Sequence, residues 1–248
     1  SCPAPTAGPG LARAGRMGQV MGSVLSSDDS SGYVFDRDGL GHAHAYLLPT
    51  VRAVLGRMPE GERRVFELGC GNGAVANRLA QEGFDVIGVD PSEDGIRRAR
   101  TNFPDLRLEP ASAYDPLAAT YGTFPAVLSL EVVEHVYAPR AYARSVADLL
   151  MPGGLAIIST PYHGYLKNLA LALTGRMDAH FTALWDNGHI KFWSVRTLTQ
   201  LLVETGLDVI EVHRVGRIPA LAKSMILVAR KPAGIPDAAA PGRGRAAR

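Results

Sequence analysis

Three glycines alternate within one short segment of the chain, and their spacing indicates a site where the backbone approaches a ligand. The segment comprises Glu67, Leu68, Gly69, Cys70, Gly71, Asn72 and Gly73. A strand that runs into a glycine-rich turn and then a helix directs backbone N–H groups towards a ligand. Glycine is required where a side chain would block that approach. A purely structural turn rarely requires so many glycines, so we expect a cofactor-binding loop.

Acidic residues and a histidine follow two other β-rich runs. Asp90 and Pro91 end the second run, and a carboxylate there can accept hydrogen bonds from both hydroxyls of a ribose. The alternative is that Asp90 merely caps the helix that follows. Glu131, Glu134 and His135 follow a later run. They supply carboxylates and an imidazole, the groups that move protons in many active sites.

The elements that must position these residues alternate between short β-rich runs and helical patterns, which is typical of a parallel sheet covered by helices. Ser92 is a candidate N-cap for one helix, and the Met-Pro-Gly-Gly segment 151–154 should end another. We expect strands at 64–68, 85–89, 106–109, 126–130 and 155–159, and helices at 74–82, 92–102 and 140–150.

The pattern changes after the fifth strand. A helix at 195–205 precedes two runs, 207–214 and 224–229, with no long helix between them, so we expect an antiparallel pair. A helix at 44–55 either packs over the mouth of the site or merely covers the sheet. The predicted fold is α/β, a Rossmann-like doubly wound sheet of seven strands. It is mostly parallel, with a closing antiparallel strand and a small helical or irregular lid insertion at about 161–193.

Composition is ordinary for a soluble globular protein, with 248 residues, 46% hydrophobic and 20% charged. We expect a flexible arm at 1–30, one domain at 31–232 and a disordered basic tail at 233–248. No apolar run approaches the ~18 residues of a membrane helix. The first residues do not resemble a secretory signal.

Charge and cysteine content argue against several classes of protein. From Lys231 onward the chain carries a net charge of +3, so the rest is −1 within a total of +2. A nucleic-acid binder usually has a basic folded face, so nucleic acid is not an expected partner. Cys2 and Cys70 offer neither a metal-type spacing nor an expected disulfide, which favours a reducing cytoplasm.

The glycine-rich segment and the residues that follow the next three strands, here called the four stations, occur in the same order as in the class I S-adenosylmethionine-dependent methyltransferases, which the chain resembles. The motif of this family is an acid, an apolar residue and then Gly-x-Gly-x-Gly. The resemblance implies that S-adenosylmethionine is the cofactor and that the loop packs against its amino-acid and ribose parts. Glu67 would hold the ammonium group, often through water, and Asp90 the ribose. Ser112 and Ala113 would lie at the adenine edge, where related enzymes commonly have an Asp. Leu130 and Glu131 would meet the methionine end and the methyl group.

Two other classes of protein remain open. Gly71-x-Gly73-x-x-Ala76 also fits the dinucleotide fingerprint of an NAD-dependent oxidoreductase. That class would require a Tyr-x-x-x-Lys pair, which is not visible, and does not account for the closing strand pair. The third class is a cofactor-binding or partner protein without catalytic activity.

The run from Glu131 to Val136 resembles the ubiquinone-biosynthesis O-methyltransferases and the methyltransferase type 11/12 group around them. In some of these enzymes the matching residues hold a magnesium-type ion, so Glu131, Glu134 and His135 become metal candidates. Magnesium prefers oxygen ligands, and many relatives carry a similar segment without a metal. We therefore favour a His135 that is oriented by a neighbouring carboxylate.

The acceptor is expected to be a small molecule, with oxygen favoured over nitrogen or carbon as the attacking atom. Trp185 and Trp193 in the insertion form either an aromatic wall for a planar or apolar acceptor or a small core of the lid itself. A hydroxyl acceptor must lose a proton, and His135 and His189 are the candidate bases. The DNA-methylating Asn/Asp-Pro-Pro-aromatic motif does not occur after the fourth strand. The sequence indicates neither the acceptor's identity nor the oligomeric state.

Overall fold

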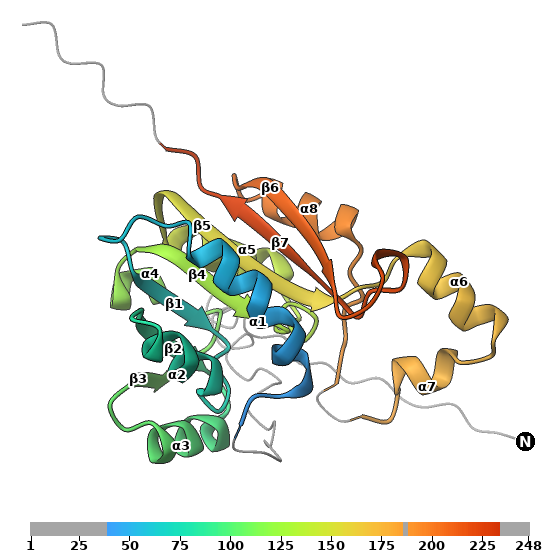
Figure 1. The fold of residues 1–248 in the computed structure, drawn as a ribbon, viewed down its shortest axis with the longest axis horizontal. Helices are drawn as coiled ribbons and strands as arrows, with labels where there is room; N and C mark the ends of the chain where they lie inside the picture. The colour runs from blue at the N-terminus through green and yellow to red at the C-terminus, as the bar shows by residue number, and fades with distance from the viewer. Residues whose placement is uncertain (1–38, 186–187, 234–248) are drawn as a thin grey trace, which may run out of the picture.

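One seven-stranded sheet forms the centre of the protein. The computed structural model describes residues 39–185 and 188–233 (Figure 1), so the predicted arm, 1–30, and all but the first residue of the predicted tail lie outside the described residues. The strand order is β3-β2-β1-β4-β5-β7-β6. The strands are β1 (Arg64–Leu68), β2 (Asp85–Asp90), β3 (Arg107–Pro110), β4 (Phe124–Leu130), β5 (Leu150–Pro161), β6 (Asp208–Val215) and β7 (Ser224–Arg230).

Strand direction agrees with the predicted fold. The five neighbouring strands β3, β2, β1, β4 and β5 pair in parallel, whereas β7 runs antiparallel to both β5 and β6. The seven-stranded, mostly parallel α/β fold is therefore confirmed. One boundary differs: α5 ends before residues 151–154 as expected, but β5 begins at Leu150 and not at the expected residue 155. There Leu150 pairs with Phe124 before a register shift leads into the main ladder.

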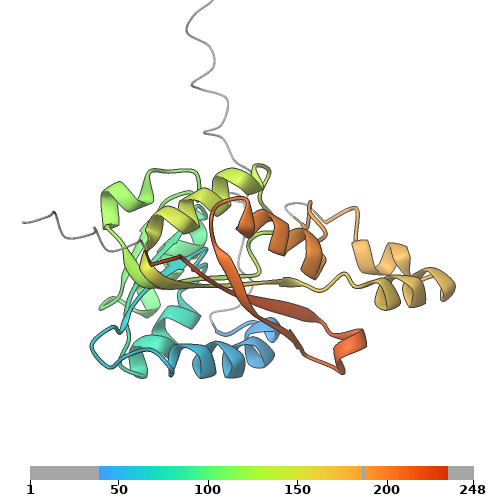
Figure 2. The ribbon, with the colours of Figure 1, turned by 90° about the horizontal axis from the view of Figure 1, so that it is seen from above.

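Helices cover both faces of the sheet, as the edge-on view in Figure 2 shows. Buried side chains of α1, α2 and α3 pack on one face, and those of α4, α5 and α8 pack on the other. The helices are α1 (His42–Leu55), α2 (Ala74–Gln81), α3 (Glu93–Asn102), α4 (Leu117–Tyr121), α5 (Pro139–Leu149), α6 (Tyr165–Leu173), α7 (Met177–Phe181) and α8 (Val195–Val203), with a 3₁₀ turn η1 at Pro219–Leu221. The sequence did not indicate α4, whose five residues are too few to show a helical period.

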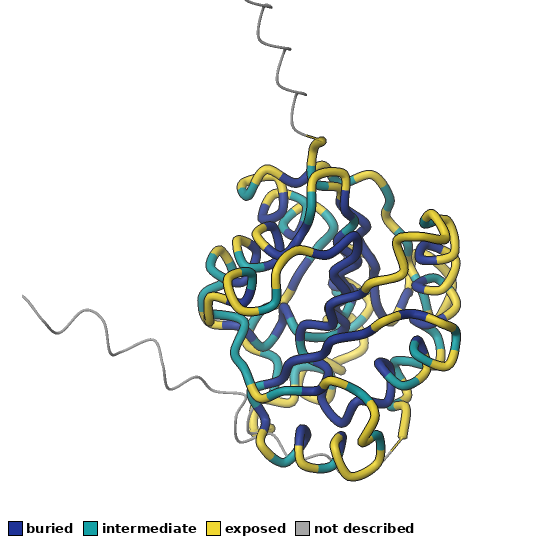
Figure 3. Tube along the Cα trace, turned by 90° about the vertical axis from the view of Figure 1, so that its left-hand side faces the viewer, coloured by how far each residue is buried: buried dark blue, intermediate teal, exposed yellow. Residues whose placement is uncertain are grey.

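Burial is concentrated in the strands, which form the dark central band of Figure 3. All residues of β4 are buried, as expected of a central parallel strand with helices on both faces. The insertion differs, because neither α6 nor α7 contains a buried residue. In the described part of the chain, no helix combines the length and apolarity that crossing a bilayer requires.

Local capping confirms one sequence-based expectation. The Ser92 side chain accepts a hydrogen bond from the Gly95 N–H at 3.1 Å and thereby caps α3. A side chain that satisfies one otherwise unpaired N–H group stabilises the helix start. The cap also fixes the direction in which the chain leaves β2, and that direction positions Asp90.

A substitution at Gly88 would test how closely β2 packs against its neighbours. A Cβ added to Gly88 would lie 2.7 Å from Leu108 Cδ2 and 2.8 Å from Cys70 Cβ. Because these neighbours are buried, we expect Gly88→Ala to destabilise the fold by about 1–3 kcal/mol in urea unfolding. Gly61→Ala is the matched control, since an added Cβ there would meet no heavy atom within 4 Å. Equal stability of the two variants would contradict this packing argument.

Candidate active site

A cavity of about 360 Å³ lies at the carboxyl ends of the parallel strands. Parallel strands end at one edge of the sheet, and ligands bind there where the strand order reverses, which is here between β1 and β4. The loops after β1, β2, β3 and β4 all contribute to the wall. The first turn of α1 adds Ala43 and His44, and the insertion adds Trp185 and His189. Thus α1 both covers the sheet and reaches the site.

The glycine loop forms the floor of this cavity. Gly69, Cys70, Gly71 and Asn72 line it. The N–H groups of Gly69 and Cys70 donate to the Val89 carbonyl at 2.8 and 3.0 Å, which holds the loop against β2. Gly69 has a φ of 83°, and a Cβ there would lie 2.4 Å from Val132 Cγ2. The turn therefore requires glycine at this position for both conformation and space.

Gly73 has a different place from the other predicted cofactor contacts. It does not line the cavity. A Cβ at Gly73 would lie 2.6 Å from Leu108 Cδ1 and 3.1 Å from Ala99 Cβ, and its φ is 76°. The absence of a side chain thus lets the start of α2 pack tightly against α3 and β3.

Asp90 joins the glycine loop to the end of β2. Its carboxylate is buried and accepts hydrogen bonds from the Ser92 N–H at 2.8 Å and the Gly71 N–H at 2.9 Å. Burial raises the Asp90 pKa to about 6, and these two bonds oppose the shift. Each carboxylate oxygen keeps a second lone pair, and Asp90 lines the cavity. The helix cap itself is supplied by Ser92, so capping does not account for Asp90.

Glu67 places on the wall a carboxyl group that has one unpaired oxygen and one hydrogen bond from the Ala76 backbone. Only 2% of the residue is exposed, and its Oε2 has no hydrogen-bond partner among the described residues. Burial, and then the nearby charge of Asp90, raise the Glu67 pKa to about 8. An unpaired buried carboxyl is costly, and a cationic ligand group beside it would offset that cost. This site therefore suits a ligand with an ammonium group.

The station after β3 contributes Ala111, Ser112, Ala113 and Tyr114 to the cavity. The Ser112 Oγ accepts from the Tyr114 N–H at 3.2 Å, and the Ser112 N–H donates to Asp115 Oδ2 at 2.7 Å. Ser112 is thus engaged in its own turn, and Tyr114 adds an aromatic wall. Sequence reasoning did not assign a role to Tyr114, although its place after a parallel strand was a usable signal.

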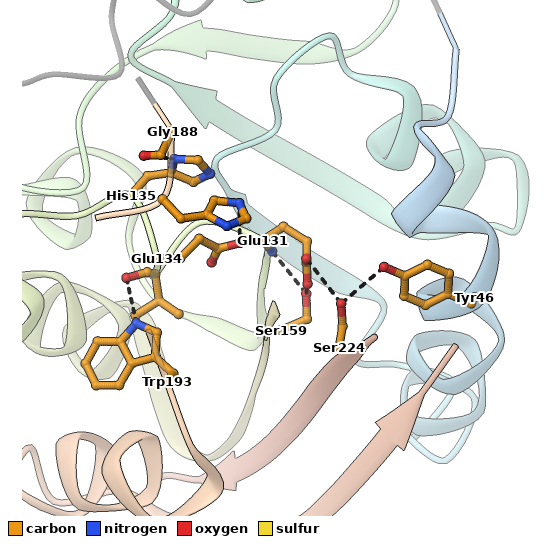
Figure 4. A network of polar contacts seen from close by, with 10 residues as sticks. Tyr46, Glu131, Glu134, His135, Ser159, Gly188, Trp193 and Ser224 are labelled. Carbon is orange, nitrogen blue, oxygen red and sulfur yellow. Dashed lines mark hydrogen bonds and ion pairs between the residues drawn. The ribbon is translucent and has the colours of Figure 1, made fainter. Parts of the chain in front are cut away.

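Glu131 is held in an unusual backbone conformation at the end of β4. Its φ is 55°, in the left-handed region that non-glycine residues seldom adopt. This turn directs its carboxylate to two hydroxyls: Ser159 Oγ donates to Oε1 at 2.8 Å and Ser224 Oγ donates to Oε2 at 3.2 Å (Figure 4). The Tyr46 hydroxyl oxygen in turn lies 3.2 Å from Ser224 Oγ, within hydrogen-bond distance. Burial raises the Glu131 pKa to about 7, which both serines oppose.

Glu134, His135 and His189 come together at the same end of the cavity. Their candidate ligand atoms all lie within 4.8 Å of one another, and Glu134 Oε1 is 3.9 Å from His189 Nε2. Neither oxygen of the buried Glu134 has a hydrogen-bond partner among the described residues. This set differs from the predicted metal set, because Glu131 turns towards the serines and His189 takes its place. Two imidazoles and one carboxylate do not match the oxygen donors that magnesium prefers, so we derive no step through such an ion.

The segment 188–193 is fixed to the site by backbone groups. The Glu134 carbonyl accepts from the Ile190 and Lys191 N–H groups at 2.9 Å each. Trp193 Nε1 donates to the Val133 carbonyl at 3.0 Å (Figure 4). His135 Nδ1 lies 3.2 Å from the Gly188 carbonyl. These bonds explain how His189, distant in sequence, reaches His135, with ring centroids 4.9 Å apart.

The two tryptophans have separate roles. Trp193 is buried in the core beneath α5 and α8, whereas Trp185 is 45% exposed and lines the cavity. The aromatic-wall alternative thus applies to Trp185, whereas Trp193 packs in the core of the domain and not in a core of the lid itself. His163 and His180 do not line the cavity and instead pack with Phe181 and Phe192. His44 lines it from α1.

The fold and the cavity define a Rossmann-like domain whose cavity lies where such folds bind nucleotide-type cofactors, at the carboxyl ends of the strands. A family model described as "Methyltransferase domain" matches residues 40–212, so the chain belongs to this family. The match confirms the family that the glycine loop indicated. Twelve residues were predicted as cofactor contacts, and eleven of them line the cavity: Glu67, Gly69, Cys70, Gly71, Asn72, Asp90, Pro91, Ser112, Ala113, Leu130 and Glu131. Their individual roles stay predictions.

Curated relatives include two ubiquinone biosynthesis O-methyltransferases. The one from Caulobacter sp. (strain K31) is 42% identical over 134 residues, which cover 52% of each chain. The one from Caulobacter vibrioides is 35% identical over 155 residues, covering 61% of this chain and 54% of the relative. The chain thus spans about half the length of these relatives.

Solved structures support the fold. An S-adenosylmethionine-dependent methyltransferase from Mesorhizobium loti has a TM-score of 0.58 at 22% identity, covering 77% of this chain and 98% of that one. The magnesium protoporphyrin IX methyltransferase from Synechocystis PCC 6803, with bound S-adenosylhomocysteine, has a TM-score of 0.56 at 19% identity. The match covers 74% of this chain and 82% of that one. At these identities the similarity is one of fold.

The raised pKa of Glu67 predicts a specific pH dependence of stability. Its folded pKa of about 8 exceeds the ordinary 4.5, so the stability that protonated Glu67 contributes relative to the unfolded chain is fully present below pH 4.5 and is lost as the pH rises towards 8. Glu67→Gln cannot ionise. We expect the free energy of unfolding of this variant, minus that of the wild type, to increase by about 1.4 kcal/mol per pH unit in that window, up to a few kcal/mol in total.

Urea unfolding at pH 5, 6, 7 and 8 without cofactor would measure this difference. Glu62→Gln, at an exposed glutamate, is the control and should follow the wild type at every pH. Parallel pH profiles for Glu67→Gln and the wild type would show that Glu67 ionises normally in the folded protein.

Proposed function

We propose that the protein transfers a methyl group from S-adenosylmethionine to a hydroxyl oxygen of a small-molecule acceptor. The observation that carries this proposal is the buried carboxyl of Glu67, with its unpaired Oε2, on the wall of a cavity formed by all four predicted stations. The names of the two Caulobacter relatives support oxygen as the acceptor atom. The buried free thiol of Cys70 supports a reducing compartment, the cytoplasm.

The cavity residues divide into stations that match the parts of the proposed cofactor. Glu67 would hold the ammonium group, and Asp90 would accept the ribose hydroxyls through its remaining lone pairs. The segment 111–114 would enclose the adenine, and Leu130 with Glu131 would lie by the methionine end. When bound, S-adenosylmethionine supplies a methyl group that its sulfonium makes electrophilic. The protein then contributes orientation of donor and acceptor, which can lower the barrier by several kcal/mol.

His135 and His189 are the groups placed to remove the acceptor's proton. A carbonyl can only accept a hydrogen bond, so the contact of His135 Nδ1 with the Gly188 carbonyl puts the proton on Nδ1. In the neutral ring Nε2 is then the basic nitrogen. Burial, and then His135 and His180, lower the His189 pKa to about 4, so this ring is neutral at pH 7. Glu134 Oε1 lies 3.9 Å from His189 Nε2, and burial, and then the charge of Glu131, raise the pKa of this carboxyl group well above its usual range.

Cofactor binding provides the first test. We expect S-adenosylhomocysteine, which retains the ammonium group, to raise the melting temperature, because a ligand stabilises the state that binds it. NAD should have no effect. A cation favours ionised Glu67, so affinity should rise by up to about tenfold per pH unit as pH approaches 8. Glu67→Gln should lose both this slope and about tenfold in affinity at pH 8.

Stabilisation by NAD without stabilisation by S-adenosylhomocysteine would contradict the proposal. Glu62→Gln again serves as the control for a lost surface charge and should bind like the wild type.

Turnover provides the second test. With methyl-labelled S-adenosylmethionine and a panel of phenolic acceptors, we expect His189→Ala or His135→Ala to lower kcat by about 100-fold or more. The affinity for S-adenosylhomocysteine should stay within about threefold, since neither ring belongs to the ammonium or ribose station. His213→Ala, on β6, is the control and should keep the wild-type rate. Unchanged kcat in both site variants would exclude these histidines as bases, and no turnover of any acceptor would favour a non-catalytic protein.

A further inference from the structure

The positive end of the α6 helix dipole lies at Tyr165, close to Lys167 in the sequence. No side chain caps it, its N-cap is Gly164, and its first turn contains no acidic residue. The first N–H groups of a helix lack partners within the helix, and the helix dipole makes this end positive. Lys167 nevertheless lies in this first turn, where a cation is unfavourable. An anion at this position would reverse that conflict.

Other cations reinforce the positive potential. The Lys167 ammonium is half-buried, and its Nζ donates one hydrogen bond, to the Tyr162 carbonyl at 2.9 Å. Burial, and then the charge of Arg217, lower the Lys167 pKa. Across the described residues, neither Lys167 nor Arg217 forms an ion pair with a carboxylate. Glu131 acts on Lys167 only at longer range, and its oxygens bind serine hydroxyls.

Polar atoms beside this helix end also lack partners. His163 directly precedes the N-cap and is 9% exposed, and its Nδ1 has no hydrogen-bond partner in the described structure. The same holds for Asn168 Oδ1 and His180 Nε2. The rings of His163 and His180 are 5.4 Å apart. Unpaired polar atoms are costly inside a protein. A ligand group that accepts hydrogen bonds would satisfy the two imidazole nitrogens when these carry a proton, whereas Asn168 Oδ1 can only accept.

Electrostatic contacts connect this group to the active site. The Lys167 charge acts on Glu131, which lines the cavity. His163 and His180 both interact with His189, a candidate base. Phe181 and Phe192 flank His163 with ring centroids 5.7 and 5.1 Å away. The group therefore lies on the side of the histidines, where an acceptor would approach, and has an apolar flank.

We propose that the N-terminus of α6, with Lys167 and His163, is an anion subsite that binds a carboxylate or phosphate group of the methyl acceptor. The assignment of the anion to an acceptor rests on the proposed function, whereas anion binding itself does not. Lys167 and the first N–H groups of α6 bind the charged group, and Phe181 and Phe192 contact the adjoining apolar part. The subsite thus selects acidic acceptors over neutral ones of the same shape.

Phenyl phosphate and benzyl alcohol are suitable probes, because both are aromatic and only the first is anionic. Calorimetry at constant ionic strength, with S-adenosylhomocysteine present, should give phenyl phosphate an affinity at least about tenfold higher. Lys167→Met and Leu166→Glu should each remove that preference, and Lys167→Arg should retain most of it. Leu166 is 58% exposed, so the acid introduced there adds a competing charge to the helix start without disturbing the core.

Lys191→Met is the matched control, since it removes a lysine from the same insertion outside α6. Equal affinity for the two probes in the wild type, or an equal loss in Lys191→Met, would overturn the proposal. So would binding to vesicles containing phosphatidylglycerol without binding to phenyl phosphate, since the anion would then belong to a lipid. Affinity for S-adenosylhomocysteine, measured separately in each variant, reports on the proposed function and should not change with Lys167.

Discussion

The carboxylate of Asp90 is the interaction on which the site depends. By accepting the N–H groups of Gly71 and Ser92, it ties the loop after β1 to the chain leaving β2. Ser92 in turn caps α3, and Gly73 allows α2 and α3 to pack closely. Two adjacent loops therefore keep one relative position without any ligand. A cavity formed in this way is preorganised, which lowers the cost of binding.

A second network extends this rigidity to the far side of the sheet. The positive φ of Glu131 turns its carboxylate to Ser159 on β5 and Ser224 on β7, and Tyr46 on α1 continues the chain of hydroxyls. When Glu131 is ionised, Ser224 donates its single proton to the carboxylate, and the Tyr46 hydroxyl then donates to Ser224. The antiparallel closing strand thus contributes a residue to the site. Backbone strain at Glu131 is offset by these hydrogen bonds, a pattern common at functional sites.

Local patterns in the sequence determined what could be predicted. The strands and the cofactor loop follow from β-rich runs, glycine spacing and the acids at strand ends, all of which are encoded by neighbouring residues. The grouping of Glu134 and His135 with His189 was not predictable, because it depends on backbone bonds that bring residue 189 back to residue 134. The positive φ of Glu131 was equally hidden, since nothing in a glutamate indicates it. That conformation removed Glu131 from the predicted metal set.

The insertion combines a fixed part with a weakly packed part, and this division bears on function. Residues 190 and 191 bind the Glu134 carbonyl, so the position of His189 does not depend on the Glu134 side chain. Both oxygens of the Glu134 carboxyl group stay unpaired among the described residues, and Oε1 lies 3.9 Å from His189 Nε2. In contrast, α6 and α7 bury no residue. Substitutions there cost little stability, because few contacts are lost. The two helices of the insertion can therefore change chemically while His135, His189 and the cavity keep their geometry.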